Sequence, residues 1–95
     1  MKYVFLPESR EEFLKEIEYF EECRKGLGQE FSKEVFSAIQ RIINFPDAWT
    51  KLSKNTRRAL TNRFPFGVIY HIDDEMIVVV AVMQLNRDPD YWKNR

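Results

Sequence analysis

The sequence has only one cysteine, Cys23, and one histidine, His71. A single cysteine excludes an internal disulfide, and with one histidine it cannot form a common zinc site unless carboxylates or a second chain contribute. We therefore expect no metal site, no cofactor and a reducing compartment. Cys23 is interpreted as an incidental thiol and His71 as a surface or packed residue.

Long apolar runs are also absent. The longest, from Met76 to Met83, has only the length of a strand, so no signal peptide and no membrane span are predicted, and we expect a soluble, cytoplasmic protein. Repeats, linkers and low-complexity stretches are missing as well. The 95 residues suffice for one modest core, which predicts a single domain over residues 1–95.

The chain has no excess of charge, because 15 basic side chains balance 15 acidic ones. The total therefore gives no argument for an anionic membrane surface or for sequence-specific nucleic-acid binding. The distribution is nevertheless uneven. Residues 8–34 contain nine acidic and five basic side chains, whereas residues 51–63 contain five basic and none that is acidic. The middle of the chain is thus a local basic strip.

Two helices are predicted after a short opening strand. Residues 2–6 are rich in aromatic and β-branched side chains and end at Pro7. Ser9 and Glu12 have the spacing of a capping box at the start of the first helix. The apolar face of this helix carries Phe13, Ile17 and Phe20, and Lys25-Gly26-Leu27-Gly28 ends it.

A broader apolar stripe marks the second helix, which Asn44-Phe45-Pro46 ends. Its members are Phe31, Val35, Phe36, Ala38, Ile39, Ile42 and Ile43. The short loop between the helices predicts an antiparallel hairpin, and the apolar side of this hairpin needs a sheet to cover.

Three further strands are predicted in the second half, at Arg58–Phe64, Phe66–Ile72 and Glu75–Met83, with a tight turn at Asp73-Asp74. The last strand is apolar on both faces, which favours a central position between the opening strand and the strand before it. The expected architecture is α+β: an N-terminal strand, an antiparallel two-helix hairpin and a three-stranded antiparallel sheet, with the helices on one sheet face. LSKNT is typical of a turn, so it stays open whether Lys51 and Lys54 lie on the sheet or in a loop.

Several motifs in this order carry a family likeness: the GLG-x-x-F start of the second helix, the proline that ends it, the RFPFGVIY strand segment and the closing R-D-P-x-x-W. Together they resemble the RelE/ParE toxin superfamily of bacterial type II toxin–antitoxin systems, and its ParE branch in particular. The resemblance implies a sheet whose concave face and C-terminal tail meet a target. It also implies no cofactor, a role in growth inhibition and plasmid stabilization, and a cognate antitoxin that lays a helix or strand across the toxin.

Members similar to RelE cut messenger RNA on the ribosome, whereas members similar to ParE poison DNA gyrase without known chemistry of their own. For cleavage, the matching groups in this sequence are Lys54, Arg63, Arg87 and Tyr91. Many relatives have His-x-Arg-Arg after the last strand, but this chain has Gln84-Leu85-Asn86-Arg87 there. Gln84 cannot donate a proton, and a tyrosine with an ordinary pKa of about 10 needs strong tuning to do so near neutrality. We therefore favour a gyrase-directed toxin, with a ribosome-dependent endoribonuclease or an inactive relative as alternatives.

The resemblance also assigns contact residues. Candidates for target binding are Arg58, Arg63, Arg87, Tyr91, Trp92 and Arg95. Candidates for an exposed apolar surface that binds the antitoxin are Leu60, Phe64, Phe66 and Ile69. Within the tail, we expect Trp92 to fold back on the core and Arg87, Tyr91 and Arg95 to point outward. Arg58 and Arg63 have a second interpretation, as charges that protect a strand edge from pairing.

Overall fold

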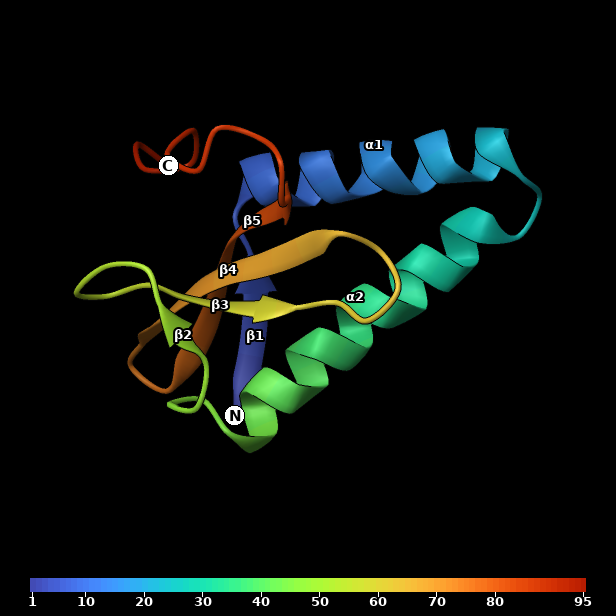
Figure 1. Ribbon diagram of the computed structural model, residues 1–95. Helices are drawn as coiled ribbons and strands as arrows, with labels where there is room; N and C mark the ends of the chain where they lie inside the picture. Colours follow the sequence, from blue (N-terminus) through green and yellow to red (C-terminus); the bar gives the residue numbers. More distant parts are fainter.

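The computed structural model describes all 95 residues and has two helices beside one five-stranded sheet (Figure 1). In chain order the elements are β1 (Lys2–Phe5), α1 (Pro7–Cys23), α2 (Leu27–Asn44), β2 (Thr50–Lys51), β3 (Arg57–Leu60), β4 (Phe66–Asp73) and β5 (Met76–Gln84). The strands are arranged β1-β5-β4-β3-β2, with β1 parallel to β5 and all other neighbours antiparallel. The predicted α+β class and the central position of the last strand are confirmed. The sheet is mixed and contains one more strand, β2, than we expected.

The two helices form the predicted hairpin because two glycines allow a tight connection. Gly26 has a φ of 87°, a conformation that other residues adopt only with strain. A Cβ on Gly28 would clash with the carbonyl oxygen of Ile17 in α1, so only glycine permits this approach of the helices. Glu21 fixes the loop, since its carboxylate accepts the backbone N–H groups of Gly26 at 2.8 Å and Gly28 at 3.0 Å.

The predicted capping box is wrong. Helix α1 begins at Pro7, whose fixed φ suits the first helical position, so Ser9 lies inside the helix and its hydroxyl is 2.7 Å from the carbonyl oxygen of Val79. Glu12 does not turn back to the helix start. Its carboxylate instead accepts the backbone N–H of Val82 in β5 at 2.9 Å, which ties α1 to the centre of the sheet.

The buried side chains form two clusters, one on each face of the sheet, and β4 and β5 pair through a β-bulge. Ile69 pairs with Ala81 while Tyr70 pairs with Val79, so Val80 is an extra residue in β5. On the helix side lies a cluster of 13 buried residues, built largely from the stripe of α2 and the inward side chains of the sheet. On the other face a smaller cluster contains Ile69, Val80, Ala81, Met83 and Trp92.

Two predicted boundaries in the second half are wrong. Strand β3 ends at Leu60 and does not reach Phe64, because Thr61 turns the chain and its hydroxyl donates to the carbonyl oxygen of Phe64 at 2.6 Å. The turn between β4 and β5 is Asp74-Glu75, one residue later than expected. Both residues have positive φ, 49° and 65°, as two-residue hairpin turns with the right twist require. Neither α1 nor α2 contains an apolar stretch that could span a bilayer.

Candidate functional site

The C-terminal tail is held against α1 by one carboxylate, that of Glu12. The hydroxyl of Tyr91 donates to Glu12 Oε2 at 2.5 Å, and Arg95 Nη1 donates to Glu12 Oε1 at 3.1 Å. Arg87 Nη1 lies 3.6 Å from the same carboxylate. The guanidinium carbons of Arg87 and Arg95 are 3.8 Å and 4.9 Å from the centre of the Tyr91 ring, within the range of cation–π attraction. We call these four residues the tail clasp.

The clasp changes the expected orientation of the tail. The prediction that Trp92 folds back is confirmed, because its side chain is buried in the cluster on the face opposite the helices. The prediction that Tyr91 and Arg95 point outward is wrong, since both are held by Glu12 and the side chain of Arg95 is only 17% exposed. Arg87 remains 54% exposed and can still meet a partner.

The environment of Tyr91 also bears on chemistry. Burial raises the pKa of its phenol, and the hydrogen bond to the Glu12 carboxylate together with the negative charge of Glu12 raises this pKa further. The nearby guanidinium groups oppose this shift but do not outweigh it. The phenol therefore holds its proton more firmly than a free tyrosine, which is unfavourable for a general acid near neutral pH.

Arg63 is engaged by two carboxylates of α2. Its Nε donates to Glu34 Oε2 at 3.0 Å, and its Nη2 lies 3.5 Å from Glu30. Glu34 also accepts the backbone N–H groups of Asn62 and Arg63 at 2.9 Å and 2.8 Å. Burial alone would raise the pKa of Glu34, but these hydrogen bonds from Arg63 and the loop outweigh it and lower the pKa. Arg63 thus has a clear structural role in docking the β3–β4 loop onto α2.

Arg58 lies on the sheet face that the helices leave uncovered. Its aliphatic stem crosses Gly67, where an added Cβ would be 2.8 Å from Arg58 Cδ. Its Nε is buried and has no hydrogen-bond partner, and neither has the indole N–H of Trp92, which covers the same face.

The four candidates for antitoxin binding do not form one exposed surface. Leu60 is 46% exposed and Phe64 is half-buried, but Phe66 is 2% and Ile69 0% exposed. The expectation that Phe66 and Ile69 are exposed is wrong, because β4 is covered by helices on one face and by the tail on the other. An apolar groove of about 250 Å³ lies beside strand β1 at the sheet edge, and the sequence pattern did not predict it. The groove is lined mainly by Tyr3, Phe5, Phe13, Leu14 and Phe36.

The cleavage candidates do not converge. Lys54 lies in the β2–β3 loop, before β3 begins, whereas Arg63 follows the end of β3 and binds α2. Arg87 and Tyr91 follow β5 and contact α1. The sequence left open whether Lys51 lies on the sheet or in a loop, and in the structure it is the last residue of β2. Among the described side chains, no three His, Cys, Asp or Glu residues are arranged to hold a metal ion.

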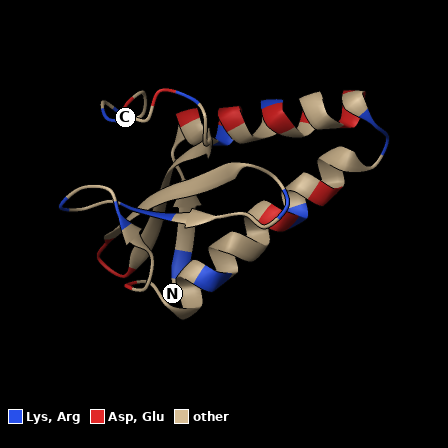
Figure 2. Ribbon diagram, viewed as in Figure 1, with Lys and Arg blue, Asp and Glu red and all other residues tan.

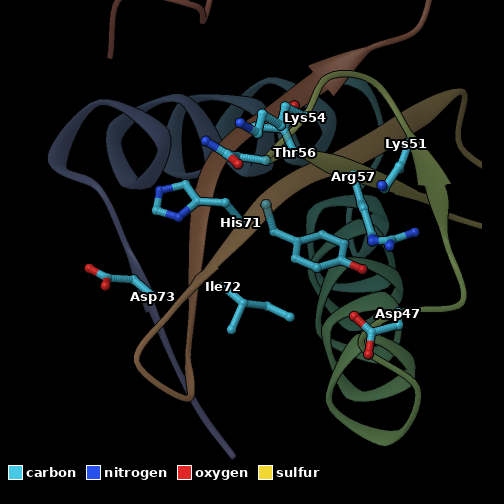
Figure 3. A pocket seen from close by; sticks show the side chains of 10 residues that line it. Asp47, Lys51, Lys54, Thr56, Arg57, His71, Ile72 and Asp73 are labelled. Carbon is cyan, nitrogen blue, oxygen red and sulfur yellow. The ribbon is translucent and has the colours of Figure 1, made fainter.

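Charges are unevenly distributed over the molecule (Figure 2). Acidic residues follow one another along α1, while lysine and arginine gather at the β2–β3 hairpin. This hairpin borders the largest hollow described in the protein, a cavity of about 510 Å³ between the hairpin and the end of β4 (Figure 3). Its walls are polar, and Lys51, Lys54 and Arg57 contribute the positive charge.

Comparison with known proteins agrees with this architecture. The family described as "ParE toxin of type II toxin-antitoxin system, parDE" matches residues 3–89. A solved structure titled "Chromosomal ParDE TA system from P. aeruginosa" is similar with a TM-score of 0.66 at 9% sequence identity, over 90% of this chain and 97% of that one. At this identity the structural likeness establishes the fold alone. No curated protein sequence gives a significant match.

Proposed function

Because the chain belongs to the ParE toxin family of type II toxin–antitoxin systems, we propose that it arrests bacterial growth by binding DNA gyrase and that a cognate antitoxin neutralises it. In this proposal the toxin acts by binding and performs no covalent chemistry. The observation that carries the choice is the tail clasp, in which the hydroxyl of Tyr91 donates a hydrogen bond to Glu12 at 2.5 Å. The one phenol available near the end of the last strand therefore serves the structure of the tail.

The remaining groups support the same choice. Cleavage of a phosphodiester needs a base, a cation and an acid within reach of one phosphate. Lys54 lies at the opposite end of the sheet from Arg87 and Tyr91, and the Arg63 guanidinium is already neutralised by Glu34 and Glu30. For ribonuclease activity, these side chains would have to leave their present contacts and come together around one phosphate.

For the target we propose the surface that joins the exposed part of the clasp to the uncovered sheet face. Arg87 is 54% exposed there, and Arg58 is half-buried on the sheet face beside it. In purified form the chain should inhibit supercoiling by DNA gyrase, and Arg87→Gln should weaken inhibition about tenfold. Lys93→Gln is the matched control, because Lys93 is equally exposed on the same tail and pairs only with Asp90. Gln84→Ala should inhibit like the parent protein, whereas a ribonuclease that depends on this position would be affected.

For the antitoxin we propose the groove beside β1 in place of the buried Phe66 and Ile69. Phe36 is 43% and Tyr3 40% exposed at this groove, and the outer edge of β1 has no neighbouring strand. An apolar helix or strand of the antitoxin can cover both features. Phe36→Ser should weaken the complex with the antitoxin encoded by the adjacent gene at least tenfold. Phe45→Ser is the matched control, since Phe45 is 64% exposed outside the groove. Equal loss in both variants would contradict this location.

A further inference from the structure

The cavity between the β2–β3 hairpin and the end of β4 has no part in the proposed contacts with gyrase or antitoxin. We call it the hairpin basin. It measures about 510 Å³, and its cationic side chains come from Lys51, Lys54 and Arg57. Figure 3 shows Lys51 and Lys54 on the upper side of the view, with Asp47 and Asp73 on the lower side. His71 also lines the basin and adds a ring nitrogen.

Two of the cations are placed directly opposite each other. Lys51 of β2 is the cross-strand partner of Arg57 in β3, so both side chains leave the same face of the sheet. Like charges at such positions destabilise a strand pair. No carboxylate lies within 4.0 Å of Lys51, Lys54 or Arg57 to relieve this repulsion, although ion pairs are common elsewhere in the protein. An unneutralised cation pair in a cavity wall is a suitable binding site for an anion.

A hydrogen bond to the backbone holds the Arg57 side chain in place without a ligand. Its Nη1 donates to the carbonyl oxygen of Trp49 at 2.8 Å, which leaves the other guanidinium nitrogens free for a ligand. Tyr70 forms part of the floor, and its hydroxyl is used by the carbonyl oxygen of Pro46 at 2.6 Å. The basin therefore offers a preorganised guanidinium with two exposed ammonium groups beside it.

The walls limit the class of anion. Only two of the ten lining residues are hydrophobic, Tyr70 and Ile72, so the basin has no apolar slot for a base or another ring. Asp47 and Asp73 reduce the net charge of the lining to +1, from three cations and two carboxylates. Such a surface suits one phosphate of a chain that passes over it and is contacted without base recognition.

We propose that the hairpin basin binds a backbone phosphate of duplex DNA through Lys51, Lys54 and Arg57. The choice of duplex DNA over another phosphate chain rests on the proposed function, because DNA gyrase acts on duplex DNA. The toxin then contacts the DNA held by its target as well as the target protein. The basin lies away from the tail clasp, on the hairpin at the other end of the sheet, so the two contacts can be made together.

Binding of a short fluorescent DNA duplex over a series of salt concentrations tests this inference. With one phosphate neutralised, the logarithm of the association constant should fall with the logarithm of salt concentration with a slope of about −0.9. The double variant Lys51→Gln/Lys54→Gln should bind at least ~10-fold more weakly at low salt and with a slope closer to zero. The matched control Lys25→Gln/Lys33→Gln has the same change in net charge at exposed positions outside the basin, and should bind like the parent protein.

The outcomes separate this inference from the proposed function. Equal loss of affinity in the two double variants, or an unchanged slope in Lys51→Gln/Lys54→Gln, would overturn the assignment of the basin. Tighter, lysine-dependent binding of single-stranded RNA would overturn duplex DNA as the ligand. Lysine-dependent DNA binding without inhibition of gyrase would preserve the basin and contradict the proposed function. Lys51→Gln alone should not lower the melting temperature, because it removes a repulsive pair, whereas a purely structural lysine would.

Discussion

The hydroxyl of Tyr91 lies 2.5 Å from the carboxylate of Glu12, which is 79 positions earlier in the chain. This contact joins the tail to the first helix and places Trp92 over the sheet face that the helices leave open. The same carboxylate accepts the backbone N–H of Val82, so one side chain connects the helix, the central strand and the tail. The tail is therefore part of the fold and also carries Arg87, the exposed cation of the proposed target surface.

Loss of the Glu12 charge should loosen the tail. Glu12→Gln keeps the size of the side chain but weakens the hydrogen bonds to Tyr91 and Arg95, and we expect a cost of about 2 kcal/mol in the free energy of unfolding. Denaturant unfolding measures the cost, and faster hydrogen exchange near Trp92 locates it. Glu11→Gln is the control, since Glu11 is 71% exposed and pairs only with Lys15. A variant as stable as the parent would mean that Glu12 is not the anchor of the tail.

Gly28 should be intolerant of any side chain. Gly28→Ala places a methyl group against the Ile17 carbonyl and the side chain of Glu21, which forces the helices apart. We expect a loss of about 2 kcal/mol in the free energy of unfolding, typical of overpacking at a close contact. Gln29→Ala, at the next and exposed position, should have little effect on the melting temperature. If both substitutions are harmless, the close approach does not stabilise the hairpin.

Alkaline pH should destabilise the protein through Tyr70. Burial raises the pKa of Tyr70 to about 12 from its ordinary value of 10. Its contribution to stability is therefore complete below pH 10, where neither state is ionised, and is lost as the pH rises from 10 through 12. Tyr91 shifts in the same direction.

The test is unfolding free energy as a function of pH. Tyr70→Phe should be less stable at neutral pH, because the hydrogen bond to Pro46 is lost, but should show a flatter decline above pH 10. Tyr3→Phe changes an exposed phenol and should retain the decline of the parent protein. An equally steep decline in Tyr70→Phe would contradict the shift.

Acid should release the β3–β4 loop through Glu34. Its pKa is lowered from 4.5 by the hydrogen bonds from Arg63 and the loop, so its contribution to stability is present above pH 4.5 and is lost as the pH falls through the folded-state value. Glu34→Gln should therefore flatten the acid limb of the stability curve. Glu18→Gln, on an exposed position of α1, is the control. The amide protons of Asn62 and Arg63 should exchange faster in Glu34→Gln than in the control.

Much of the fold could be predicted because periodic apolar residues determine it. The stripe of α2, the double-sided apolar run of β5 and the glycines of the helix connection each have a local signature. The predictions were wrong where a contact with a residue distant in the sequence determines the local structure. Ser9 lies inside the helix because the helix begins at Pro7, and its hydroxyl donates to the carbonyl oxygen of Val79. The bulge at Val80 depends on how β4 and β5 pair.

The candidate functional surfaces were less predictable for the same reason. Glu12 belongs to a motif of helix starts, and only the folded chain brings it to Tyr91 and Arg95. Leu60, Phe64, Phe66 and Ile69 look alike in a sequence, yet tail and helices bury the last two. The repulsion between Lys51 and Arg57 follows from strand register, which residue types alone do not give.

The most direct test of the central claim is pulse-labelling of DNA and protein synthesis just after the chain is induced in bacteria without its antitoxin. A toxin that binds DNA gyrase should depress DNA synthesis first, with protein synthesis declining later, and co-expression of the antitoxin should prevent both effects. An immediate fall in protein synthesis while DNA synthesis continues would contradict the account and would favour cleavage of messenger RNA on the ribosome.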